Sequence, residues 1–258
     1  MVLQDQISDI EFDEYLAIDA LSKSKLARFA EAPILAHYAR EKTAALTFGS
    51  LIHTAILEPN ALELRYQVTD LDRRGSKAWN AEEDEARGRE LVKRDEWDMA
   101  QNIRESVWLS KTAAELLTGI SVEQTAVWED EHTGLLCKAR ADVLNAKLGA
   151  IIDLKSCVSA SYAKFSRDIA EYKYHWQDAF YRPGFAQCGF IAENFIFIAV
   201  EKNAPHLVGI YEIDRDDIRH AEEQVKSQML RYAECKDNNV WPGYDDYIVT
   251  AFLPKWAL

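Results

Sequence analysis

Cysteine is scarce in this 258-residue chain, and the few cysteines are dispersed. No two of them have the C-x-x-C spacing, so neither a structural zinc site nor an iron–sulfur cluster is expected. Chains without paired cysteines are typically reduced and cytoplasmic, and we expect this localisation. The four positions are Cys137, Cys157, Cys188 and Cys235.

Long apolar runs are also absent. None reaches the roughly 20 residues that span a bilayer, and the first stretch, MVLQDQISDIEFDEY, is too acidic for a signal or transit peptide. No membrane partner is expected. There is no internal repeat and no low-complexity linker, and 48% of the residues are hydrophobic. The sequence therefore predicts one folded domain over 1–258.

Positive charge is deficient, since the formal net charge is −13. Non-specific coating of DNA depends on neutralising phosphates, so this balance argues against it. An enzyme that holds nucleic acid in a local basic channel is still compatible with an acidic surface. Basic residues gather within 23–28 and 73–77, and each group could equally be an ordinary solvated face.

The hydrophobic pattern predicts helices and strands in an order typical of an α/β (α+β) fold. Ser22 is the expected N-cap of the first helix. Helices are expected over 23–30, 48–57, 80–117 (in one or two pieces), 162–169, 174–190 and 216–235. Strands are expected within 62–78 and over 122–129, 135–144, 149–155, 195–200 and 207–213, with a hairpin turn at 130–134. This order predicts a central mixed β-sheet flanked by helices, with a helical N-terminal part of about 1–118 and a sheet core of about 119–258.

The most informative stretch is the strand predicted over 149–155. Because side chains two positions apart leave the same face of a strand, Asp153 and Lys155 should point together while Ile152 and Leu154 enter the core. A second acid, Asp142, lies in the preceding strand. Two carboxylates and an ammonium at the edge of a core would suit a divalent metal and a phosphate, which is the chemistry of a nuclease. The same D-x-K triplet also fits the solvated face of a half-buried strand.

Four further residues can be weighed with this group. Glu123 precedes the hairpin on a face that an acid of the partner strand could share. His53 lies in a predicted helix with Gly49 one turn earlier, and Gln177 and Tyr181 lie one turn apart on another helix. Each also has an ordinary explanation: a solvent-facing glutamate, a core histidine and an aromatic-rich core helix.

These residues occur in the order G-x-x-x-H, E, D, D-x-K and Q-x-x-x-Y, on helix, strand, strand, strand and helix. This ordered set resembles the RecB-like branch of the PD-(D/E)XK nucleases, which have a restriction-endonuclease-like core. Within that branch the chain is similar to the RecE (exonuclease VIII) nuclease domain, a relative of the lambda-type exonucleases. Further similar segments lie at 18–24, 48–59, 128–137, 172–181 and 253–257. In one departure, Pro183 should kink or end the helix after the Q-x-x-x-Y motif.

The resemblance implies a divalent metal held by His53, Asp142, Asp153 and the backbone carbonyl of Leu154. Mg²⁺ favours oxygen ligands, and an imidazole in the ligand set would also tolerate Mn²⁺. We expect no iron–sulfur cluster.

It also implies roles for the remaining polar residues. Lys155 would orient the attacking water and stabilise the developing charge, and Glu123 would bind a second metal or position the nucleophile. Gln177 and Tyr181 would steady the lysine, the water or the DNA.

The implied activity is 5′→3′ resection of linear double-stranded DNA, which leaves 3′ tails for a RecT-like annealing protein. The resemblance further implies a ring-shaped homo-oligomer, trimer or tetramer, and a stand-alone phage or prophage enzyme. Alternatives are a Cas4- or AddB-like nuclease and a non-catalytic DNA-binding module of the same fold. Candidate contacts to DNA are Ser22, Ser24, Arg73, Arg74 and Lys77.

Overall fold

A mixed six-stranded sheet forms the centre of the molecule. The computed structural model describes residues 4–38 and 43–253. The strand order is β1-β4-β5-β6-β7-β8, and neighbours are antiparallel except for the parallel pair β6–β7. The strands are β1 (Gln6–Ser8), β4 (Ser121–Glu129), β5 (Leu136–Asn145), β6 (Ala150–Cys157), β7 (Asn194–Glu201) and β8 (Val208–Tyr211).

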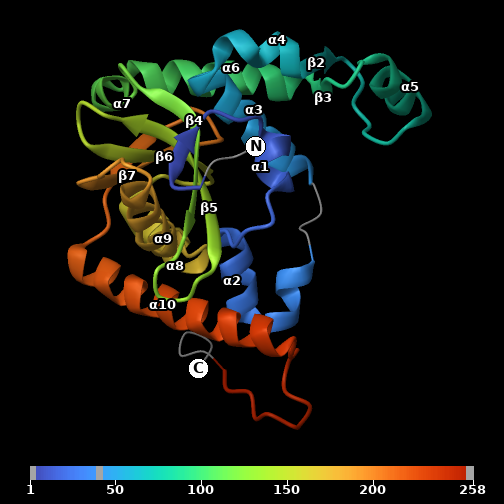
Figure 1. The fold of residues 1–258 in the computed structure, drawn as a ribbon. Helices are drawn as coiled ribbons and strands as arrows, with labels where there is room; N and C mark the ends of the chain where they lie inside the picture. Colours follow the sequence, from blue (N-terminus) through green and yellow to red (C-terminus); the bar gives the residue numbers. More distant parts are fainter. Residues whose placement is uncertain (1–3, 39–42, 254–258) are drawn as a thin grey trace.

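Helices cover both faces of this sheet (Figure 1). Helices α2 (Lys23–Glu31), α8 (Tyr162–Glu171), α9 (Tyr174–Gln187) and α10 (Arg215–Asn238) form one layer, and α3 (Ala44–Leu57), α6 (Arg94–Leu109) and α7 (Lys111–Leu116) form the other. Two apolar cores result. In β6, Ile151 packs in the core beneath α9, whereas Ile152 and Leu154 pack in the core beneath α3 and α6. Burial on both faces explains the nearly continuous apolar run of this strand.

The remaining elements are short. They are α1 (Phe12–Ala17), the 3₁₀ turns η1 (Pro33–His37) and η2 (Pro59–Ala61), α4 (Leu62–Arg65), β2 (Tyr66–Thr69), α5 (Lys77–Glu85) and β3 (Glu90–Lys93). The parallel pair β2–β3 and helix α5 extend away from the central sheet (Figure 1). Within the described ranges, 4–38 and 43–253, no helix has the length and apolar character that crossing a membrane would require.

The fold class predicted from the sequence is confirmed: helices flank a central mixed sheet, and most elements lie within a few residues of their expected bounds. The prediction of helix throughout 80–117 was wrong, because β3 interrupts it. Arg87 and Gly88 have positive φ angles of 54° and 84° and end the helical path. Leu91 and Val92 are then buried against β2. The part of the family resemblance at 254–257 lies outside the described residues.

Pro183 was also predicted to kink or end the helix after Tyr181. The prediction that it ends the helix was wrong, because α9 continues to Gln187. Phe180 and Phe185 are buried on either side of the proline, so packing against the sheet outweighs the lost backbone donor. This packing matters for function because α9 carries the Q-x-x-x-Y motif.

Gly184 allows α9 to approach β4. A Cβ atom at this position would lie 2.4 Å from the ring of Trp128, which is itself buried. Gly184→Ala should therefore destabilise the protein by about 1–3 kcal/mol through overpacking, despite the better helix propensity of alanine. Thermal unfolding followed by circular dichroism measures the change. Gly49→Ala in α3 is the matched control: a Cβ there meets no atom within 4 Å, so its melting temperature should stay equal or rise.

Candidate active site

Three acids form a row across three neighbouring strands. In the pairing of β4 with β5, the neighbours of Glu123 are matched with the neighbours of Asp142. The same register places these two acids opposite each other. The ladder between β5 and β6 stops at Val143↔Ile152, and one step further along the same register lies Asp142 opposite Asp153. Because opposite residues of antiparallel strands are close neighbours, the three acids lie in adjacent positions where the ladder ends.

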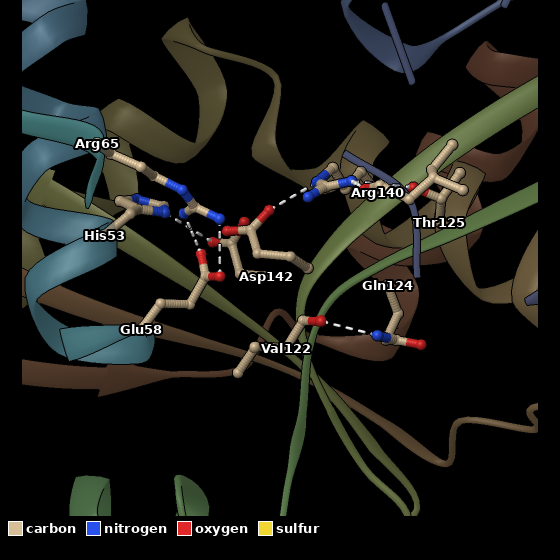
Figure 2. Close-up of polar contacts among 10 residues, drawn as sticks. His53, Glu58, Arg65, Val122, Gln124, Thr125, Arg140 and Asp142 are labelled. Atoms are coloured by element: carbon tan, nitrogen blue, oxygen red, sulfur yellow. Dashed lines mark hydrogen bonds and ion pairs between the residues drawn. The ribbon is translucent and has the colours of Figure 1, made fainter. Parts of the chain in front are cut away.

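The backbone at Glu123 is distorted. Its φ of +54° lies in the left-handed region, which non-glycine residues occupy at a cost and mostly at functional sites. Beyond it the strand changes face: Val122 packs against the core beneath α3, whereas Ala126 belongs to the core beneath α9. The Gln124 side chain supports this turn by donating to the Val122 carbonyl at 2.8 Å (Figure 2). The distortion turns Glu123 out of the ladder and into the site.

The Asp142 carboxylate takes the place of a backbone acceptor where the β5–β6 ladder ends. Its Oδ2 accepts a hydrogen bond of 2.8 Å from the Leu154 amide, and it lies 3.6 Å from His53 Nδ1. The pKa of Asp142 is raised to about 7, first by burial and second by the charge of Asp153, while His53 acts in the opposite direction. The ionised form of Asp142 would therefore gain from a further positive charge beside it. For Leu154 the structure records the amide contact, and its carbonyl as a metal ligand stays a prediction.

Asp153, Lys155 and Gln177 form a second, more buried network. Lys155 Nζ forms an ion pair with Asp153 Oδ2 and donates to Gln177 Oε1 at 3.2 Å, while Gln177 Nε2 donates to Asp153 Oδ1. The Lys155 ammonium also lies 4.7 Å from the centre of the Tyr174 ring. Asp153 is 2% exposed, so its charge depends on these partners. Asp153 and Lys155 therefore share a face, as period two predicts.

Tyr181 lies one turn after Gln177 on α9 and lines the cleft beside the acids. Burial raises the pKa of its hydroxyl well above the ordinary value, and the charges of Tyr15, Asp153 and Asp142 raise it further. The hydroxyl therefore stays protonated and can act only as a neutral hydrogen-bonding group.

The donor set fits a divalent cation. His53, Glu123 and Asp142 each offer one ligand atom, and these atoms all lie within 4.8 Å of one another. An imidazole nitrogen with carboxylate oxygens suits Mg²⁺, Mn²⁺ and related ions. This set differs from the predicted one: it includes Glu123, whereas the Asp153 carboxylate faces Lys155 and Gln177. Asp153 Oδ2 is buried, and Lys155 is its ion-pair partner.

Sequence reasoning missed Arg140. Its Nε donates to Glu123 Oε2 at 2.7 Å, and NH1 donates to the Ile10 carbonyl at 2.5 Å and to Thr125 Oγ1 at 3.3 Å. Figure 2 shows the guanidinium reaching along the strands beside Asp142. Arg140 thereby holds Glu123 and ties the N-terminal segment to the site. Its position two residues before Asp142, on the same strand, was the available signal.

The site opens into a large cleft. The cavity has a volume of about 1750 Å³, more than the roughly 300–1,000 Å³ of a typical small-molecule pocket, so it suits a segment of a polymer. Its lining includes His53, Glu123 and Asp142, together with Ser22 and Ser24 from the start of α2. Five cations also line it: Arg65, Lys138, Arg140, Lys164 and Lys202.

The other basic candidates lie elsewhere. Arg73, Arg74 and Lys77 stand beside the projecting α5 and do not line this cleft. Arg74 forms an ion pair with Glu96 and lies over the Trp79 ring at 4.8 Å. The structure therefore brings the two serines to the site and the basic loop to a different part of the molecule.

Comparison with known proteins places this geometry in a family. A search of curated proteins found no match. Among solved structures, the fold is similar to the crystal structure of a candidate exonuclease from Eubacterium rectale, with a TM-score of 0.68 and 16% identity over 96% of this chain and 97% of that one. At this identity the likeness concerns the fold. Residues 20–248 match the family described as a PDDEXK-like domain of unknown function (DUF3799), and the chain belongs to that family.

Proposed function

We propose that this protein is a metal-dependent exodeoxyribonuclease that resects linear double-stranded DNA from the 5′ end. The observation that carries the proposal is that His53, Glu123 and Asp142 meet in a large cleft, with Asp153 and Lys155 paired in the next strand behind them. A PDDEXK-like family and a fold similar to a candidate exonuclease support nuclease chemistry. The choice of exonuclease, its polarity and its RecE-like character rest on the sequence resemblance.

In this proposal His53, Glu123 and Asp142 hold Mg²⁺, for which Mn²⁺ can substitute. A divalent cation there supplies positive charge to the scissile phosphate and makes water a better nucleophile at neutral pH. The protein's own contribution is positioning. Lys155, held by Asp153 and Gln177, presents an ammonium that orients the water and stabilises charge that develops on the phosphate. Tyr181, neutral because of its burial, donates a hydrogen bond to the strand or the water.

The biological role follows from the product. Resection from a 5′ end leaves a 3′ single strand, which is the substrate of a RecT-like annealing protein. A ring-shaped homo-oligomer, trimer or tetramer, would enclose the duplex and needs a basic bore only on its inner side. That arrangement reconciles a net charge of −13 with a polyanionic substrate.

The function is tested with purified protein, Mg²⁺ and duplex DNA labelled at either the 5′ or the 3′ end. We expect digestion of linear duplex, release of the 5′ label first and no attack on covalently closed circles. EDTA should abolish the reaction. Cleavage of closed circles would reject the exonuclease assignment, and an absence of any cleavage would favour a non-catalytic DNA-binding module.

The role of Lys155 is tested by Lys155→Met, which keeps most of the side-chain volume and removes the charge. Cleavage should fall by about 10²–10³-fold, the typical loss for one charge-stabilising group. Since this change leaves Asp153 buried without its ion pair, the double variant Asp153→Asn/Lys155→Met should fold with a near-wild-type melting temperature and remain inactive. Lys147→Met, in the exposed turn between β5 and β6, should keep full activity. A fully active Lys155→Met protein would contradict the assignment.

Metal binding is tested by thermal unfolding without DNA. Manganese at about 100 times its dissociation constant should stabilise the wild-type protein by about 2.7 kcal/mol. Asp142→Asn should lose most of this stabilisation. Its metal-free form should be as stable as wild type or more so, because one charge leaves a crowded acidic site. Asp98→Asn, on the exposed face of α6, is the control and should keep the full shift. Equal shifts in all three proteins would place the metal elsewhere.

A further inference from the structure

A second arginine reaches the site from the opposite side to Arg140. Arg65 is the last residue of α4, and Glu58 is the C-cap of α3, the helix that carries His53. The Arg65 guanidinium donates to both oxygens of Glu58, NH1 at 2.5 Å and NH2 at 2.9 Å. Figure 2 shows this pair beside His53 and Asp142. The arginine is thus fixed at the rim of the candidate metal centre by a fork-to-fork contact.

Three of the other cleft cations have partners within the protein. Lys138 donates to three backbone carbonyls, those of Tyr15, Leu16 and Ile18. Arg140 holds Glu123, and Lys164 is paired with Asp168. These contacts serve the protein itself.

Arg65 commits two of its five N–H donors to Glu58, and its side chain is 39% exposed. It has donors and open space left for a ligand.

The neighbours of Arg65 are negatively charged. Its pKa is raised chiefly by the hydrogen bonds that it donates to Glu58, and the carboxylates of Glu11 and Glu123 act in the same direction. An arginine next to acids that hold a metal sits where a phosphodiester strand must pass. The planar guanidinium matches phosphate oxygens in a bidentate way that lysine cannot.

We propose that Arg65 binds a backbone phosphate of the DNA strand next to the phosphate at the metal centre, and that Glu58 orients Arg65 for this contact. This inference rests on the proposed nuclease function and names a substrate contact within it. Glu58 follows His53 by five residues, or about 7.5 Å along the axis of α3. The contact therefore belongs to a neighbouring phosphate rather than to the scissile one. Glu58 also balances the charge of Arg65 when no DNA is bound.

The test measures equilibrium binding of a fluorescent linear duplex by anisotropy, with Ca²⁺ in place of Mg²⁺, over a series of salt concentrations. Arg65→Ala should weaken binding about tenfold and reduce the slope of log affinity against log salt by about 0.9, the value for one lost phosphate contact. Arg94→Ala is the matched control. Arg94 pairs with Asp70 through an exposed contact of 3.1 Å outside the cleft lining, so its loss should change affinity less than twofold.

Glu58→Gln separates a phosphate contact from a purely structural ion pair. If the pair only joined α3 to α4, Glu58→Gln and Arg65→Ala would weaken binding together and lower the melting temperature alike. The proposal predicts that the two variants change affinity in opposite directions. Glutamine keeps an amide oxygen that accepts from Arg65 and orients it, and it removes a negative charge beside the DNA, so Glu58→Gln should bind DNA equally well or more tightly. Weaker DNA binding by both variants would overturn the proposal.

The outcomes also separate this inference from the proposed function. If the wild-type protein binds and cleaves linear duplex but Arg65→Ala binds it with unchanged affinity and salt slope, the inference fails alone. If the wild-type protein neither binds nor cleaves DNA, the proposed function fails and the inference fails with it.

Discussion

The hydrogen bond from the Leu154 amide to the Asp142 carboxylate is the contact on which the site depends. It stands where the β5–β6 ladder ends and a backbone carbonyl would otherwise accept that amide. By taking over this role, Asp142 lets the two strands separate without leaving a buried donor unpaired. Asp142 and the neighbouring Glu123 then line the cleft, while Asp153 and Lys155 form the more buried network behind them. A sheet that continued its regular pairing would leave no room there.

The site is also organised by charge. Several carboxylates meet on the floor of the cleft, and cations from different segments oppose them: Arg140 from β5, Lys155 from β6 and Arg65 from α4. Each cation contacts its own acid, so each acid has a fixed position before substrate arrives. Such preorganisation is what electrostatic catalysis requires, because no reorganisation is then needed at the moment of reaction. The pKa of Asp142 is raised first by burial and second by the charge of Asp153, so its ionised form would gain from a divalent ion beside it.

Much of this site could be predicted because it follows local rules. Period two places Asp153 and Lys155 together, and a hairpin between β4 and β5 brings Glu123 near Asp142. The distorted backbone at Glu123 could not be predicted from the sequence, since the alternation of apolar and polar residues describes only a regular strand. Short strands such as β1 and β3 were missed because partner strands, rather than their own three or four residues, define them. Arg65 and Arg140 were missed because their roles arise only when distant segments converge. Pro183 shows the reverse case, where packing overrides a local rule.

An acidic protein that handles DNA must confine its attraction for phosphate to one place. Screening limits surface charges to about one Debye length, roughly 8–10 Å at physiological salt, so the more distant part of the net charge of −13 acts weakly in the cleft, whose lining carries both acids and cations. Glutamates that pair with arginines, as Glu58 does with Arg65 and Glu123 with Arg140, reduce that attraction further in the empty protein. A polyanion then meets only the guanidinium donors that these carboxylates leave unused. Under the proposed function, a DNA strand gains contacts both to the remaining donors of Arg65 and to the metal centre, and this would couple selective binding of the strand to its cleavage.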